Sequence, residues 1–194
     1  MSDPAGALDA IFNRRSIGRL QPPAPTDDDL RTILRAAAAA PDHGELKPFR
    51  FTVLDGDAQD RFGEVLEQAY LARCEETGRE PEPDKQAKER TKLGRAPLVV
   101  IVSAVDQEDE KIPFVEQRDA AVAASENALI AATALGYGSM WRTGAPVDDP
   151  RVKAALGLRD KDAIVGFLYL GTIPEKFTVT PHDPDIDALL LPFS

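Results

Sequence analysis

The chain has 194 residues, with 33 Asp or Glu against 23 Lys or Arg, so its formal net charge is −10. This length suffices for one domain with a hydrophobic core, predicted to span residues 1–194, and the excess of acidic groups disfavours non-specific binding to nucleic acid or to anionic membranes. The single cysteine, Cys74, excludes an intramolecular disulfide framework and a cysteine-based zinc cluster, and no apolar run approaches the ~20 residues of a membrane span, so we expect a cytoplasmic protein without a metal site.

Helices and strands alternate in the first half of the chain. Thr26 is followed by three aspartates, which give a side-chain N-cap and an acidic first turn, and apolar residues then recur at helical spacing up to Pro41. The aromatic and β-branched residues before Asp55 favour a strand. The elements expected here are a helix over 7–13, a helix between Thr26 and Pro41, a strand over 51–54 and a helix over 61–74.

The segment 75–95 is polar, carries many charges and contains two prolines. Solvated surface is the commonest use of such a stretch. A lid over a binding site and a mobile helix are the alternatives, and the sequence leaves all three open.

The second half of the chain contains the most apolar strands and the longest helix. Residues 96–105 and 164–170 are almost wholly apolar, as in strands that are buried on both faces. The alanine-rich stretch 114–135 predicts a long helix that ends at Gly136. The shorter elements expected are a strand over 139–142 and a helix over 149–156.

The periodic pattern dissolves after Thr172, where prolines and aspartates accumulate. The chain nevertheless ends in apolar residues that a free tail would not need, namely Leu189, Leu190, Leu191 and Phe193. We therefore expect residues 172–194 to form a C-terminal arm that packs on this subunit or on a partner.

Several common chemistries have no motif in this sequence. Gly136 and Gly138 lack the third glycine of a dinucleotide fingerprint, and no phosphate-binding Gly-x-x-x-x-Gly-Lys loop is present. The two histidines do not stand at zinc-ligand spacing, and no serine lies in a nucleophile elbow. Because the side chains supply few candidate nucleophiles or metal ligands, a bound cofactor is expected to carry out the reaction.

A basic cluster follows the first predicted helix and consists of Arg14, Arg15, Ser16 and Arg19. A guanidinium group binds phosphate through two parallel hydrogen bonds, and a serine hydroxyl adds a neutral donor, so the cluster is a candidate anion site. Basic residues at the end of a helix also favour its negative pole and solvate a surface. On these residues alone, both interpretations stay open.

Two further segments carry candidate ligand contacts. Residues 41–49 are turn-rich and lie between a helix and a strand, where ligand contacts are frequent, although a lone histidine such as His43 is more often structural or solvated. Residues 136–144 contain three glycines, which allow a flat ring to approach closely, and the only tryptophan, Trp141. The alternative for this segment is a tight turn into a core strand, with Trp141 packed and Arg142 on the surface.

Taken together, these segments resemble the FMN-dependent nitroreductase family. The resemblance covers nearly the whole chain and rests on the order and spacing of residues 13–16, 40–51, 136–144 and 165–171. It implies an α+β fold of the nitroreductase type, with a central mixed sheet flanked by helices. It also implies an intertwined homodimer that holds FMN at the subunit interface.

The resemblance assigns roles to individual residues. The basic cluster would hold the phosphate and ribityl side of FMN in one subunit, and residues from the other subunit would meet the flavin. The residues implied in FMN binding are Arg14, Arg15, Ser16, Ala39, His43, Trp141, Arg142 and Thr143. Those implied, more weakly, in contacts with the nicotinamide donor are Ala131, Ala132, Thr133, Ala134, Leu135 and Gly136. No catalytic acid is assigned, since either His43 or solvent could give a proton.

Three positions depart from the family's pattern. The basic residue that many members carry two places after the serine is Gly18 here, and the charge stands at Arg19. The usual asparagine of the following turn is Glu45, and a common tryptophan is Phe49. These changes bear on substrate class and on flavin potential more than on flavin binding.

The function implied is an FMN-dependent oxidoreductase that takes a hydride from NADH or NADPH and reduces nitroaromatic, quinone-like or related electron-poor small molecules, with ping-pong kinetics. One alternative is a flavin- or nucleotide-binding module without turnover. Another is a related flavin enzyme that fragments or dehalogenates its ligand, which would need segment 75–95 as a lid.

Overall fold

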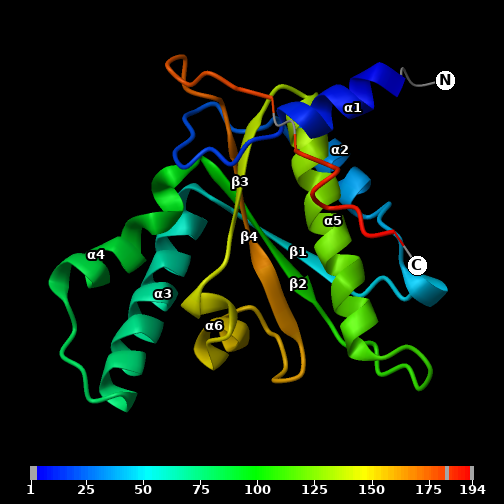
Figure 1. Cartoon of the computed structure of the whole chain (residues 1–194). Coiled ribbons are helices and arrows are strands. Elements are labelled where there is room, and N and C mark those ends of the chain that lie inside the picture. The colour runs from blue at the N-terminus through cyan, green and yellow to red at the C-terminus, as the bar shows by residue number, and fades with distance from the viewer. Residues whose placement is uncertain (1–3, 182–183, 193–194) are drawn as a thin grey trace.

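The computed structural model describes residues 4–181 and 184–192, and Figure 1 shows a central sheet with helices on both of its faces. The four strands are β1 (Phe49–Asp55), β2 (Leu98–Ala104), β3 (Gly138–Arg142) and β4 (Ala163–Gly171), in the spatial order β1-β2-β4-β3. This arrangement confirms the α+β fold of the nitroreductase type.

The direction of the strands differs from the expected mixed sheet. All three neighbouring pairs of strands run antiparallel, and within the described residues the parallel pairing that appears is an isolated bridge between Ser16 and Ser139. Strands that are apolar on both faces are most typical of parallel sheets. Here the same pattern arises because helices cover both faces of an antiparallel sheet.

Helices α1 (Pro4–Asn13), α2 (Asp27–Ala37) and α5 (Phe114–Ala134) lie on one side of the sheet (Figure 1). The buried face of α5 consists largely of alanine, which lets α2 and the sheet approach it closely. Ile33 of α2 and Leu129 of α5 are fully buried in this half of the core. The oxygen Oγ1 of Thr26 accepts a hydrogen bond from the amide of Asp29 at 3.2 Å, which confirms the predicted N-cap.

Helices α3 (Gly56–Glu76) and α6 (Pro150–Ala155) cover the other face, where Leu66 and Val152 are fully buried. Helix α3 begins five residues before the expected position, directly after β1, because the turn into the helix needs little more than Gly56 at a positive φ of 41°. Helix α5 ends as predicted, with Gly136 at a φ of 84°.

Segment 75–95 contains helix α4 (Pro83–Thr91) and a 3₁₀ turn, η2 (Lys92–Arg95). Helix α4 packs against α3, where Arg90 forms an ion pair with Glu64 at 2.7 Å. The contact is close, because a Cβ atom on Gly63 would lie 2.2 Å from the carbonyl oxygen of Arg90. The segment is therefore a helical excursion that packs on α3. No helix in the described part of the chain has the length and apolar character that crossing a membrane requires.

Asp162 precedes β4 and is almost fully buried, with 2% of its surface exposed. Burial alone raises the pKa of this carboxyl, but hydrogen bonds from the side chain and amide of Arg159 and from the amide of Asp106 outweigh burial and lower the pKa from 3.8 to about 2. The ionised carboxylate therefore stabilises the fold above pH 3.8, and this stabilisation is lost as the pH falls towards 2.

Replacing Asp162 with asparagine is expected to lower the free energy of unfolding by ~2 kcal/mol at pH 7 and by roughly half as much at pH 3. Urea denaturation of both proteins at the two pH values measures this difference. Asp160→Asn, at an exposed neighbour, is the matched control and should change neither value. A deficit of equal size at pH 7 and pH 3 would show that the ionisation of Asp162 does not stabilise the fold.

Candidate functional site

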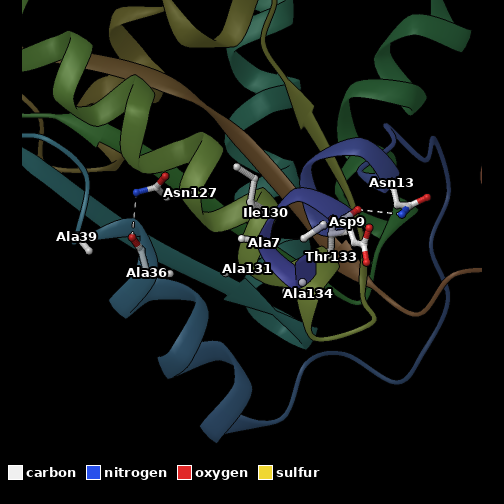
Figure 2. A pocket seen from close by; sticks show the side chains of 12 residues that line it. Ala7, Asp9, Asn13, Ala36, Ala39, Asn127, Ile130, Ala131, Thr133 and Ala134 are labelled. Atoms are coloured by element: carbon white, nitrogen blue, oxygen red, sulfur yellow. Dashed lines mark hydrogen bonds between the residues drawn. The ribbon is translucent and has the colours of Figure 1, made fainter. Parts of the chain in front are cut away.

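A groove of about 800 Å³ lies between α1, the end of α2 and the C-terminal half of α5 (Figure 2). Small side chains leave this space open. Two side-chain amides at its edge already form hydrogen bonds: Asn127 donates to the carbonyl of Ala36 at 3.2 Å, and Asn13 donates to the carbonyl of Asp9 at 2.9 Å. A concave, mostly apolar surface with few polar groups is typical of a binding site. The lining residues are Gly6, Ala7, Asp9, Ala10, Asn13, Ala36, Ala39, Asn127, Ile130, Ala131, Thr133 and Ala134.

The groove brings together some of the residues expected from the sequence. Ala39 lines it together with Ala131, Thr133 and Ala134. The other members of the segment implied in nicotinamide binding are placed differently. Ala132 is fully buried in the core, whereas Leu135 and Gly136 are exposed beyond the lining.

The basic cluster begins where α1 ends. Arg14 donates its amide to the carbonyl of Ala10 at 3.0 Å, and its Nε lies 3.1 Å from Oε1 of Glu126 on α5. The Arg14 side chain is 28% exposed, so the guanidinium is oriented by a carboxylate but still reachable from solvent. Glu126 is not among the residues predicted from the sequence, because a helical pattern does not show which of its residues forms an ion pair with a distant arginine.

The guanidinium of Arg15 is directed inward. Its Nε donates to the carbonyl of Thr180 and its Nη1 to the carbonyl of Arg14, both at 2.5 Å. Its Nη2 is buried and has no hydrogen-bond partner among the described residues, and the same is true of Oγ of Ser139. Both residues line one small enclosed cavity of about 20 Å³. Two unpartnered polar groups around such a space leave hydrogen-bonding capacity for a bound group or a water.

Ser16 links the basic cluster to β3. Its backbone forms the parallel bridge with Ser139, and the amide of Ile17 donates to the carbonyl of Ser139 at 3.0 Å. The Ser16 side chain is exposed. Residues 14–16 therefore lie beside the start of β3, whereas residues 141–143 lie at its far end.

Trp141 packs against a glycine of the neighbouring strand. Its indole Nε1 donates to the carbonyl of Val165 at 3.3 Å, and a Cβ atom on Gly166 would lie 2.0 Å from that nitrogen. Arg142 points to the opposite face of the sheet, where its guanidinium carbon lies 5.9 Å from the centre of the Tyr169 ring. Alternation along β3 thus separates two neighbouring residues that the resemblance assigns to one cofactor.

His43 lies in a separate hollow of about 290 Å³, and its Nδ1 lies 2.7 Å from Oε2 of Glu116 near the start of α5. The backbone around it is unusual, since Glu45 and Lys47 both adopt positive φ values, and the amide of Lys47 donates to Oδ2 of Asp42 at 2.6 Å. Positions held in such conformations cluster at functional sites.

The histidine and the basic cluster are well separated in one chain. Their partners on α5, Glu116 and Glu126, are ten positions apart, which corresponds to ~15 Å of helix. A single chain therefore does not bring all the expected FMN-binding residues into one pocket.

The family model described as "Nitroreductase family" matches residues 11–172. The protein named "Putative NAD(P)H nitroreductase YdjA" from Escherichia coli K12 is 42% identical over 180 residues, which cover 92% of this chain and 94% of that protein.

Solved structures agree with the sequence comparison. A crystal structure of a nitroreductase-like family protein from Bacillus cereus superposes with a TM-score of 0.79 at 20% identity, covering 100% of this chain and 98% of the other. A crystal structure of a nitroreductase with bound FMN from Bacteroides fragilis gives a TM-score of 0.72 at 23% identity, covering 99% and 100% of the two chains. This chain, which carries the groove and the basic cluster, therefore belongs to the nitroreductase family.

Proposed function

We propose that this chain is an FMN-dependent NAD(P)H oxidoreductase that reduces nitroaromatic, quinone-like or related electron-poor compounds. Membership of the nitroreductase family supports the class of reaction, the name of the Escherichia coli relative supports the nucleotide donor, and the FMN in the Bacteroides fragilis structure supports the cofactor. In this chain, the observation that carries the proposal is the basic cluster with its unsatisfied donor beside the groove.

The residues of this cluster fit the phosphate of FMN. Arg14 is reachable from solvent, and Ser16, two residues along the chain, is also exposed. Arg15 has no carboxylate within 4 Å among the described residues, and its Nη2 lacks a partner. Hydrogen bonds between a guanidinium group and a phosphate are stronger than those between two neutral groups. Glu126 would orient Arg14 and prevent its guanidinium from folding back.

We further propose that two copies of the chain form the functional unit, with FMN at their interface. Apolar side chains are exposed on α1 and near the C-terminus, and the most exposed, Leu191, shows 94% of its surface. Leu8 and Phe12 of α1 are each about half exposed, and neither belongs to the lining of the groove. A second copy would cover these surfaces and would supply His43 to the Arg14 site of its partner, which explains why one chain keeps them apart.

When bound, FMN supplies a ring that accepts a hydride from the nicotinamide and passes it to the acceptor. The protein's part is placement and electrostatics. Arg14 and Arg15 would bind the phosphate, the indole of Trp141 would form a fixed wall because Gly166 lets it pack on the sheet, and Glu116 holds the imidazole of His43 through Nδ1. Donor and acceptor would use the groove in turn, so ping-pong kinetics are expected.

Helix α4 does not support the fragmenting or dehalogenating alternative. That activity would need a lid, and segment 75–95 packs on α3, across the sheet from the groove (Figure 1). Within one chain, as far as the structure describes it, α4 contributes no residue to the groove.

Anaerobic mixing of the FMN-loaded protein with NADH or NADPH tests the proposal. The flavin absorbance is expected to bleach with at least one of the two nucleotides and to return when a quinone or a nitroaromatic compound is added. A binding module without turnover would leave the flavin oxidised with both nucleotides. Flavin that stays oxidised therefore contradicts the proposed reaction, even if FMN binds.

A further inference from the structure

A second, enclosed cavity of about 40 Å³ lies on the face of the sheet opposite the groove, where η2 meets β3 and β4. Its lining combines cationic and hydroxyl-bearing side chains with apolar walls: Lys92, Arg142, Thr143, Pro146, Phe167 and Tyr169. Such a concentration of positive charge is unexpected in a chain whose net charge is −10.

The positive charges around this cavity exceed the negative ones. Arg142 has no carboxylate within 4 Å among residues 4–181 and 184–192, and its Nε faces the sulfur of Met140 at 3.3 Å. Arg95, at the end of η2, also forms no ion pair in this part of the chain. Lys92 pairs with Glu89 at 2.6 Å, and both side chains are about four-fifths buried. Three cations thus share one carboxylate, which leaves an excess positive charge.

The phenol of Tyr169 completes the donor set. Only 3% of this residue is exposed, and it lines the cavity together with Arg142 and Thr143. Burial raises the pKa of the Tyr169 hydroxyl, although the neighbouring Arg142 and Arg95 act in the opposite direction. The phenol therefore stays protonated at neutral pH and can donate a hydrogen bond.

We propose that this cavity is an anion subsite that binds a phosphate group, with Arg142 and Lys92 as charged donors and Tyr169 and Thr143 as neutral donors. The space admits phosphate oxygens and excludes a ring. Arg95 adds to the positive potential from η2. The source of the phosphate is either a free phosphate or the 2′-phosphate that distinguishes NADPH from NADH, and the second source rests on the proposed function.

Calorimetric titration of the FMN-saturated protein with inorganic phosphate tests the subsite itself. Lys92→Gln is expected to weaken phosphate binding at least about tenfold, since a hydrogen bond to a charged group carries that much affinity. Arg95→Gln is expected to weaken it less, because Arg95 acts through the positive potential and does not line the cavity. Lys88→Gln removes the same charge from the exposed side of α4, and it should bind phosphate as the wild type does. If the wild type binds no phosphate, or if all four proteins bind it equally, the subsite is disproved.

Steady-state kinetics identify the source of the phosphate. If the subsite binds the 2′-phosphate of NADPH, Lys92→Gln should raise the KM for NADPH about tenfold and leave the KM for NADH unchanged. Inorganic phosphate should then compete with NADPH and not with NADH. If free phosphate is the ligand, the variants lose phosphate binding and keep the wild-type ratio of the two KM values. The phosphate titration needs no turnover, so it gives an answer on the subsite even if the proposed reaction fails.

Discussion

Replacing Arg14 with alanine is expected to weaken FMN binding by about 10- to 100-fold, because a hydrogen bond to a charged group contributes ~1.5–3 kcal/mol. The substitution also releases the carboxylate of Glu126, which lies 3.1 Å from the Arg14 side chain and would then repel the phosphate. Arg14 follows the end of α1, and its hydrogen bond to the carbonyl of Ala10 comes from the backbone, so the fold should stay intact. Quenching of flavin fluorescence during titration measures the affinity, and far-ultraviolet circular dichroism measures the fold.

The matched control is Arg61→Ala, which removes the same charge from an exposed position on α3, on the other face of the sheet. It should bind FMN as the wild type does. The double variant Arg14→Ala with Glu126→Gln separates the two effects, since it should recover only the part of the loss that repulsion causes. Unchanged FMN affinity in Arg14→Ala would return the cluster to an ordinary solvated helix end.

Gly166→Ala is expected to lower the free energy of unfolding by about 1–3 kcal/mol and to displace Trp141, since the added methyl group overpacks a full site. The new Cβ would lie 2.0 Å from the indole nitrogen and 3.0 Å from the carbonyl oxygen of Arg142. The indole can move aside only by losing its hydrogen bond to Val165. Because Trp141 is the only tryptophan, the wavelength of its fluorescence reports the displacement directly.

Gly18→Ala is the control for this experiment, because a Cβ atom there has no neighbour within 4 Å and the backbone φ is not positive. It should leave both stability and emission unchanged. If Gly166→Ala unfolds at the same urea concentration as the wild type and its emission is unshifted, the packing of Trp141 on β4 does not require glycine at position 166.

Much of the fold was predictable because local physical signals determine it. The aspartates after Thr26 and the glycine after α5 set the ends of two helices, and the apolar runs within 96–105 and 164–170 became the two central strands. Strand direction was not predictable in this way. A run that is apolar on both faces shows that both faces are covered, and it does not show which way the neighbouring strand runs.

The candidate site was predictable only in part, for a similar reason. The basic cluster and the segment around His43 are visible as short motifs. Their partners on α5, Glu116 and Glu126, are not, because ion pairs between residues far apart in sequence depend on the packing of helices. The predicted strand over 139–142 already implies that Trp141 and Arg142 lie on opposite faces. It does not show what each side chain packs against, which is the α5 side of the core for Trp141 and the ring of Tyr169 for Arg142.

The central claim is that one FMN site is built from the basic cluster of one subunit and His43 of the other. Co-expression of Arg14→Ala chains with His43→Ala chains tests it, since each variant alone should be deficient in FMN binding. A mixed dimer would contain one intact site, so random pairing should restore about a quarter of the wild-type flavin sites at limiting FMN. Binding no better than that of the two variants alone would contradict an FMN site shared between subunits.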